Sequence, residues 1–312
     1  MTNFAIAIIV HNDEAGLRRL LKGLSKSTPL GVLLEVLIVD NASTEPIPAI
    51  RKSRLNISQM RRAKNSMCEA RQQALETLEC DWIGFLDSDC LVPRSWYRDV
   101  TEQIAKWNEV PGAVAWSGAT LNRGVSLLDK CIRHLGRFFF AHRELKSAKL
   151  ADHLPTCAAF YRRSKLIEIG GFPDNFDRVG EDLIVSKNLI RAGGKLFLTE
   201  CPRVAHQQRQ SWWVWWMRME RYGRAQGMVT WHHPSHLFCR RFLPLLACLL
   251  LAAGLCLIPF AVAAGALAFC VYWFAFGPSF DRIGAKSAGL VIVLGGVLMY
   301  GLGSLRGLLW RR

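Results

Sequence analysis

The sequence has no C-x-x-C pair, although it contains ten cysteines. They are scattered singly along the chain, at positions 68, 80, 90, 131, 157, 201, 239, 248, 256 and 270. This scatter argues against a zinc site and a disulfide framework, and it suits free thiols in a reducing compartment. Internal repeats and low-complexity tracts are absent as well, so we expect no repeat architecture. The start of the chain, Met1 to Phe4, also lacks the basic segment and cleavage site of a signal peptide.

Charge is missing from two C-terminal stretches, residues 242–277 and 288–305. Each reaches the roughly 18 apolar residues that a membrane-spanning helix needs. A straight helix over 242–277 would be about 50 Å long against a hydrocarbon core of about 30 Å, and Pro259 lies near its middle. That stretch is therefore either one span or a hairpin of two short spans. We expect residues 242–312 to form a transmembrane region of two or three spans.

Basic residues favour one orientation of this region. With two spans, Arg240 and Arg241 lie on the same side as Arg306, Arg311 and Arg312, whereas three spans would export the last three. Both counts leave residues 1–241 in the cytoplasm if Arg240 and Arg241 mark the inner face. We therefore expect a multi-pass protein of the bacterial inner membrane with a cytoplasmic N-terminal domain.

Acidic residues are few: 25 Asp and Glu stand against 40 Lys and Arg, a formal charge of +15. Such a domain beside a membrane is attracted to anionic headgroups and anionic substrates. No nucleic-acid-binding motif is visible, so nucleic acid is not expected as a partner. Segment 211–241 adds clustered tryptophans and arginines, which indicate an interfacial helix; the alternative is an ordinary helix packed on the domain. These are Trp212, Trp213, Trp215, Trp216, Trp231, Arg218, Arg221 and Arg224.

Residues 1–210 read as one α/β domain. Apolar runs at 4–10, 32–39 and 81–87 are typical of strands buried on both faces, and helical patterns lie between them. This alternation predicts a doubly wound, mostly parallel, Rossmann-like sheet with its functional loops at one edge. Further strands are expected at 112–121 and 195–200, with a helix after Glu181.

Two pairs of acids mark candidate chemistry. Asp87 and Asp89 follow a buried strand, and carboxylates there suit a hard cation such as Mg²⁺ or Mn²⁺; the alternative is an Asp-Ser-Asp turn. Glu181 and Asp182 begin a helix, where they either supply a tuned base or cap the helix and compensate its dipole. His206 is either a further metal ligand or a structural histidine.

Four ordered motifs carry a resemblance: His11-Asn12, Val39-Asp40-Asn41-Ala42-Ser43, Leu86-Asp87-Ser88-Asp89 and Gly180-Glu181-Asp182. Together they resemble the inverting family 2 glycosyltransferases of GT-A fold, over roughly residues 3–227. The segment from Arg191 to Arg224 is similar to membrane-bound bacterial enzymes that build exopolysaccharides of the succinoglycan type. No Q-x-x-R-W motif follows Asp182, which argues for transfer of one sugar per encounter.

The resemblance implies a role for each matched residue. Asp182, with Glu181 beside it, would supply the catalytic base. Asp89, together with Asp87, would hold the metal. The nucleotide-sugar donor would be bound by Asp40, Asn12, Asn65, Arg71 and Asp87. Two of these roles rest on an altered motif, because Asn65-Ser66-Met67 and Ala70-Arg71-Gln72 lack the family's usual glycine and second asparagine.

The implied function is a metal-dependent transfer of a sugar, from a nucleotide donor that is expected to be UDP-linked, to a lipid-linked saccharide in exopolysaccharide synthesis. Two alternatives stay open. One is transfer to polyprenyl phosphate itself; the other is a non-catalytic membrane scaffold that recruits other polysaccharide-assembly proteins. Donor sugar, acceptor and linkage are not encoded in any motif that we recognise.

Overall fold

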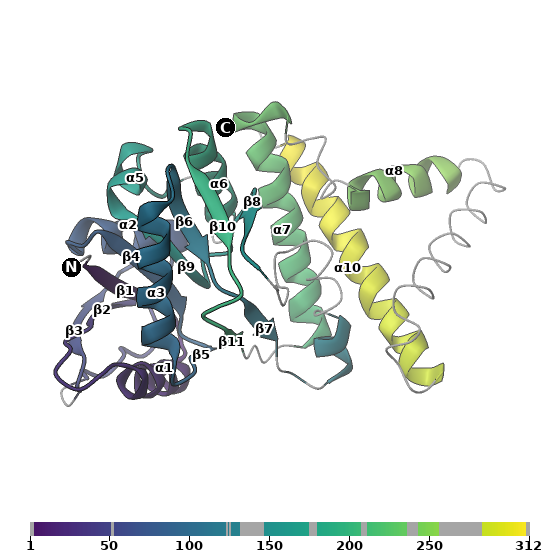
Figure 1. Cartoon of the computed structure of the whole chain (residues 1–312). Coiled ribbons are helices and arrows are strands. Elements are labelled where there is room, and N and C mark those ends of the chain that lie inside the picture. Colours follow the sequence, from purple (N-terminus) through teal and green to yellow (C-terminus); the bar gives the residue numbers. More distant parts are fainter. Residues whose placement is uncertain are drawn as a thin grey trace. The chain divides into compact units, whose positions relative to one another are not determined.

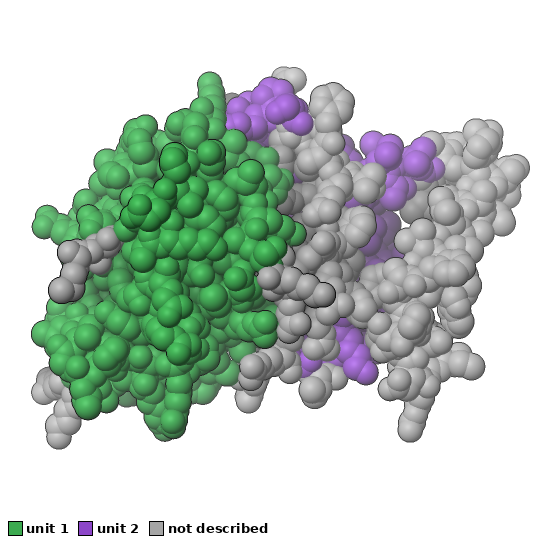
Figure 2. Space-filling model, in the orientation of Figure 1, with its two compact units in different colours: residues 1–123, 141–208 green, residues 124–140, 209–312 purple. Residues whose placement is uncertain are grey.

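The computed structural model describes residues 3–50, 53–122, 124, 126–131, 147–174, 180–206, 211–235, 243–255 and 283–309. The chain divides into two compact units (Figure 2). Unit 1 comprises residues 1–123 and 141–208, and unit 2 comprises residues 124–140 and 209–312. Segment 124–140 thus interrupts the first unit in sequence and belongs to the second.

Unit 1 contains an eight-stranded mixed sheet in the order β3-β2-β1-β4-β9-β6-β10-β8. The pairs among β3, β2, β1 and β4 are parallel, as is β6 with β10, whereas β9 runs antiparallel to β4 and β6, and β8 to β10. The strands are β1 Phe4–Val10, β2 Glu35–Asp40, β3 Asn56–Arg61, β4 Trp82–Asp87, β6 Ala113–Ser117, β8 Lys149–Ala151, β9 Ala158–Arg162 and β10 Lys195–Leu198. The predicted α/β sheet is confirmed, with more antiparallel pairing than expected.

A second sheet of three strands, β5-β11-β7, lies next to the end of β4 in unit 1. Its strands are β5 Cys90–Leu91, β7 Thr120–Asn122 and β11 Val204–His206. The pairing of β11 with β5 places His206 opposite Cys90, next to the Asp87 to Asp89 turn. A histidine more than a hundred residues away in sequence is thereby brought to the end of β4.

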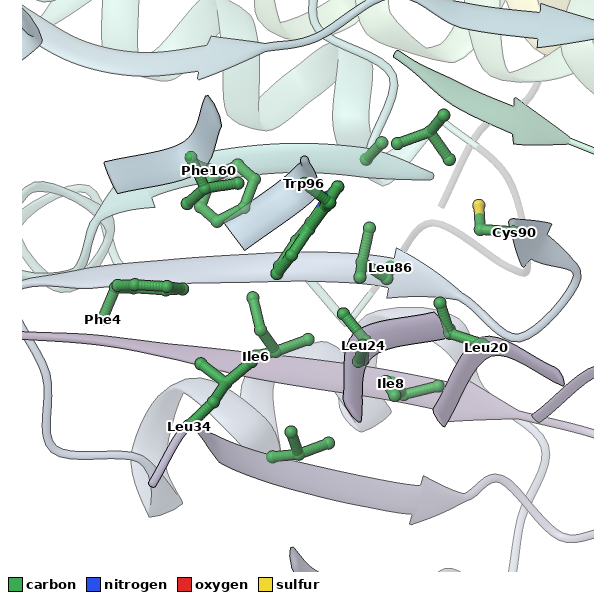
Figure 3. Packing of buried hydrophobic residues seen from close by; sticks show 14 of the residues in the cluster. Phe4, Ile6, Ile8, Leu20, Leu24, Leu34, Leu86, Cys90, Trp96 and Phe160 are labelled. Atoms are coloured by element: carbon green, nitrogen blue, oxygen red, sulfur yellow. The ribbon is translucent and has the colours of Figure 1, made fainter. Parts of the chain in front are cut away.

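Helices cover both faces of the large sheet. They are α1 Glu14–Ser27, α2 Met67–Thr77, α3 Trp96–Glu109, α5 Arg163–Glu168 and α6 Glu181–Arg191. One face of β1 packs with α1 and α3 around Trp96 and Phe160 (Figure 3), and the other packs with α2 and α6. Apolar side chains on both faces explain why β1 is an unbroken apolar run rather than an alternating one.

Gly84 in β4 is required by close packing. A Cβ at this position would lie 2.5 Å from a ring carbon of Phe160 on the neighbouring strand. The Phe160 ring in turn stacks on Trp116, with ring centroids 4.3 Å apart. The glycine therefore leaves room for the Phe160 ring, on which Trp116 stacks, against the strand that ends in the acidic turn.

Unit 2 contains the long helices α7 Trp212–His232, α8 Leu243–Leu255 and α10 Ile283–Leu309 (Figure 1). Within the described residues, one helical segment is long and apolar enough to cross a membrane, Gly289–Leu309. The described part of α8 has 13 residues, fewer than such a span needs. The other expected spans fall largely on residues 256–282, outside the described residues, so several spans are not shown.

Candidate active site

Asp40 ends β2 and organises the loop that follows it. Its carboxylate accepts hydrogen bonds from the backbone N–H groups of Ser43 (2.9 Å) and Ile47 (3.2 Å). Burial acts to raise the pKa of Asp40, but these hydrogen bonds and nearby Arg61 outweigh it, so the pKa lies below its ordinary value. Ala42 adopts a left-handed conformation, with φ of 59°, within this turn. Both carboxylate oxygens of Asp40 therefore accept hydrogen bonds from its own loop, at the edge of the sheet where the functional loops are predicted.

Asn12 and Asn65 join neighbouring loops at the same edge. The Asn12 side-chain oxygen accepts from the backbone N–H of Thr44 (2.8 Å), and the Asn65 oxygen accepts from the Asn41 amide (3.1 Å). Asn12 itself has a positive φ of 54°. The loops after β1 and β2 and the start of α2 are therefore linked, as the convergence of parallel strand ends requires.

Asp87, Asp89 and His206 form an acidic cluster with one histidine. His206 Nε2 lies 2.8 Å from Asp89 Oδ1 and 3.8 Å from Asp87 Oδ2. Burial raises the pKa of Asp87, an effect only partly offset by Arg71 and His206. A further positive charge would therefore favour the ionised form of Asp87.

The composition of this cluster fits a divalent cation. Asp89, Cys90 and His206 each place a ligand atom within 4.8 Å of the others. Oxygen and imidazole ligands suit Mg²⁺ or Mn²⁺, whereas the Cys90 thiol is buried, has a pKa well above its ordinary value and donates to the Cys157 carbonyl (3.3 Å). Asp89 and His206, with Asp87 nearby, therefore remain the candidate ligands, whereas Cys90 is better described as a packing residue.

Arg71 connects the two acidic pairs. It extends from α2, is buried, and forms ion pairs with Glu181 and with Asp87, the latter at 3.6 Å. Burial acts to lower the pKa of the guanidinium, but the surrounding carboxylates, Glu181 first, outweigh it and hold Arg71 charged. Burial also raises the pKa of Glu181 above its ordinary value despite Arg71. Arg71, which the sequence predicts at the donor, therefore pairs with the carboxylates of Asp87 and Glu181 inside the protein.

Asp182 differs from its neighbour Glu181. Its side chain is 23% exposed, compared with 6% for that of Glu181, and its Oδ2 lies 3.2 Å from His153 Nε2. Burial acts to raise the pKa of Asp182, but His153, Arg71 and a backbone hydrogen bond from Leu183 outweigh it, so the pKa is lowered. Asp182 is therefore ionised at neutral pH and partly accessible, so it is free to accept a proton.

The left-handed Gly180, with φ of 102°, begins α6 and allows the chain to present both acids in the first helical turn. Ser186 on the next turn accepts a hydrogen bond from the backbone N–H of Leu154 (3.1 Å). That contact holds the loop carrying His153 against α6. The positions of Asp182 and His153 are thus fixed by the same helix.

A model of one protein family matches residues 5–170, more than half of the chain. The description of that family is Glycosyl transferase family 2. The chain belongs to glycosyl transferase family 2. The predicted membership is confirmed, while the membrane-bound succinoglycan subgroup is not.

Curated relatives of this family 2 chain include a pre-mycofactocin glycosyltransferase of Mycobacterium tuberculosis, 25% identical over 74% of the chain and 48% of that protein. Polypeptide N-acetylgalactosaminyltransferase 8 of Drosophila melanogaster is 31% identical over 66% of the chain and 38% of its own length. The chain spans about half the length, or less, of these relatives.

Solved structures show the same fold at low identity. The mannosyltransferase PcManGT from Pyrobaculum calidifontis, in complex with GDP-Man and Mn²⁺, matches 98% of the chain and 88% of its own (TM-score 0.64, 15% identity). GalNAc-T7 with UDP, GalNAc and Mn²⁺ matches 73% of the chain and 48% of its own (TM-score 0.52, 17% identity). S. aureus TarS 1-349 with UDP matches 77% and 73% (TM-score 0.51, 16% identity).

Sequence reasoning missed two residues of this family 2 site. His153 precedes Leu154-Pro155 in a segment without a motif, and nothing nearby in sequence connects it to Asp182. Asp13 directly follows His11-Asn12; it caps α1 by accepting from the Gly16 N–H (3.0 Å), and its other oxygen accepts from the Ser88 hydroxyl (2.9 Å). Asp13 could have been predicted, because it is a polar residue directly after the first strand and can cap the helix that follows. His153 could be connected to Asp182 only once the fold was known.

Proposed function

We propose that the chain is a metal-dependent, inverting glycosyltransferase that uses a nucleotide-sugar donor, with a UDP-sugar as the first expectation. The observation that carries this proposal is the pairing of two different carboxylate environments in one site. Asp89 and Asp87 gather with His206 as candidate cation ligands, while Asp182 stands apart against His153 as an ionised base. Inverting transfer needs both functions, one on each side of the sugar.

The roles follow from these environments. Asp182 accepts the proton of the acceptor hydroxyl while that oxygen bonds to the anomeric carbon and the bond from this carbon to the diphosphate breaks. Asp89, Asp87 and His206 would hold a divalent cation, which would supply positive charge to offset the charge of the leaving diphosphate. Asp40, Asn12 and Asn65 shape the loops that face the nucleotide. Arg71 holds Asp87 and Glu181 in place, so Glu181 acts by positioning rather than by proton transfer.

We further propose that the acceptor is lipid-linked and that unit 1 works at the cytoplasmic face of a bacterial inner membrane, in the synthesis of a surface polysaccharide. The apolar C-terminal residues and the excess of basic residues support this proposal. A lipid-linked saccharide keeps the acceptor within reach of a membrane-attached enzyme. The alternatives, a polyprenyl phosphate acceptor and a non-catalytic scaffold, make different predictions for the same assay.

The test is a donor panel with the purified full chain, scored by release of the nucleoside diphosphate. The panel contains UDP-sugars and GDP-mannose, each with Mg²⁺, with Mn²⁺ and with excess chelator. We expect metal-dependent release from one UDP-sugar and loss of release in Asp89→Asn, because the variant removes one charge from the ligand set. Turnover by Asp89→Asn at the wild-type rate, or full activity in chelator, would exclude the metal assignment.

The acceptor class is tested with a radiolabelled form of the donor that the panel selects. Transfer into the lipid fraction of bacterial membranes is expected, and mild acid should release a labelled oligosaccharide from the lipid product. A product carrying a single sugar would favour polyprenyl phosphate as the acceptor. A chain that binds the donor but turns none of it over with any metal or membrane fraction would support the scaffold.

A further inference from the structure

The helices α7 and α10 of unit 2 lie side by side and run parallel to each other (Figure 1). Near their N-terminal ends, the indole N–H of Trp216 donates to the backbone carbonyl of Ile292 (2.8 Å). Near their C-terminal ends, the indole N–H of Trp231 donates to the carbonyl of Gly307 (3.2 Å). The two contacts are 15 residues apart on each helix, which is about 22 Å at 1.5 Å per residue. Over that length the two helices therefore stay side by side, without an offset along their axes.

Glycines hold this pair in register. A Cβ on Gly223 of α7 would lie 1.9 Å from the carbonyl oxygen of Tyr300, and one on Gly303 of α10 would lie 1.9 Å from that of Glu220. Gly227 and Gly307 meet backbone atoms of the opposite helix in the same way. The backbones touch on both sides of the seam, so neither helix can slide or rotate past the other without a clash.

The charged residues of α7 lie beside the C-terminal half of α10, where the Glu220 carbonyl meets Gly303 and Arg224 meets Gly307. Arg218, Glu220, Arg221 and Arg224 fall within seven consecutive residues of α7. Glu220 forms an ion pair with Arg306 of α10 (3.0 Å) and is buried, which fixes its level on the apolar helix. If Gly289–Leu309 crossed a bilayer, these charges would lie within its hydrocarbon, where arginine and glutamate are strongly disfavoured.

The face of α10 away from the glycines presents an apolar stripe. It consists of side chains at intervals of three or four residues, each more than a third exposed: Val291, Leu294, Leu298, Leu302, Leu305 and Leu309. A helix with one apolar stripe and basic residues in its partner is suited to the boundary between headgroups and acyl chains. Three arginines on α7 and a formal charge of +15 on the chain favour anionic lipid as the surface it meets.

We propose that α7 and α10 lie together along the surface of an anionic membrane, with the apolar stripe of α10 against the acyl chains, and that α10 does not cross the bilayer. The alternative of a spanning α10 separates its ends onto opposite sides. In the proposed arrangement, both ends of α10 stay on the side of unit 1. This inference does not depend on sugar transfer, and the experiment below measures none, so its failure is distinct from failure of the proposed activity.

The first arm locates the two ends of α10 in the full chain. A cysteine replaces Lys286 in one variant and is appended after Arg312 in another. Sealed membrane vesicles of both orientations are treated with an impermeant maleimide, and the labelled peptides are identified by mass spectrometry, which separates the new site from native cysteines. We expect both sites to react from the side that exposes unit 1. Reaction of the two sites from opposite sides would overturn the proposal.

The second arm identifies what covers the stripe. Benzoylphenylalanine replaces Leu298, and a matched control places it at Ile167 of α5, an equally exposed apolar residue of unit 1. On irradiation in vesicles that contain anionic phospholipid, Leu298 is expected to crosslink to lipid and Ile167 is not. A crosslink from position 298 to another part of the chain, or to a second copy, would overturn the lipid assignment.

Discussion

The two acidic pairs of unit 1 are built alike although they lie on different elements. In each, one carboxylate pairs with Arg71: Asp87 at the end of β4 and Glu181 at the start of α6. In each, the other carboxylate faces a histidine, with Asp89 against His206 and Asp182 against His153. Asp87 and Glu181 thus link the two pairs through the single guanidinium of Arg71.

The pairs differ in how their carboxylates are compensated. Burial raises the pKa values of Asp87 and Glu181, and Arg71 alone does not fully offset it. The pKa of Asp182 is instead lowered by His153, Arg71 and a backbone hydrogen bond. The ionised form of Asp182 is therefore stabilised by the protein itself, whereas the ionised form of Asp87 would be stabilised further by an added cation. This difference supports the proposal that Asp182 takes the proton and that Asp87, with Asp89 and His206, binds the cation.

The largest expected effect comes from Asp182→Asn. The amide keeps the size of the side chain but has no useful proton affinity, so transfer should fall by roughly 10²- to 10⁴-fold while donor binding is retained. Donor binding is measured by calorimetry and transfer by release of the nucleoside diphosphate. Glu181→Gln, one residue earlier, is the matched control and should lose far less. If the two variants show the reverse order, the roles of the pair are exchanged.

The sequence predicted the strand ends that carry this site because buried parallel strands leave a clear apolar signature. Asp40, Asp87 and Asp89 could be placed from those runs alone, and Glu181 and Asp182 from the helix that they begin. The inward role of Arg71 could not be predicted, because it depends on α2 facing α6 across a distance of 110 residues in sequence. Strand β9 was also missed, although its antiparallel insertion between β4 and β6 places Tyr161 beside the acids.

Arg71→Met tests whether the two pairs share one support. Removing a buried cation leaves the carboxylates of Glu181 and Asp87 without their counterion, and such a loss typically costs about 3–5 kcal/mol. The free energy of unfolding of the full chain, from urea titration, should fall by that amount. Arg18→Met is the control, since Arg18 pairs with Glu14 on the surface of α1 and should change stability by less than about 1 kcal/mol. Equal losses of unfolding free energy in the two variants would contradict the prediction that Arg71 supports both acidic pairs.

Glu181→Gln should give a smaller loss of stability than Arg71→Met. The variant removes one of the two ion pairs of Arg71 but leaves Asp87 beside the guanidinium, so a loss of about 1–3 kcal/mol is expected, as for a hydrogen bond to a charged group. The same urea titration measures it, with Glu69→Gln as the control because the carboxylate of Glu69 is half-exposed against Arg62. A loss as large as that of Arg71→Met would mean that Asp87 contributes nothing to the support.

The smallest expected effect is a shift in pH dependence from His153→Gln. The groups around Asp182 are His153, Arg71, Glu181, Asp87 and Tyr161, and His153 contributes most to lowering its pKa. Without His153 the pKa of Asp182 should rise, so its ionised form is lost at a higher pH as the solution is acidified, and the acid limb of the rate profile moves upward in pH. The profile of nucleoside diphosphate release measures this, with His232→Gln, on α7 and outside the site, as the control. A lower rate at every pH with an unmoved limb would show that His153 serves only to shape the loop.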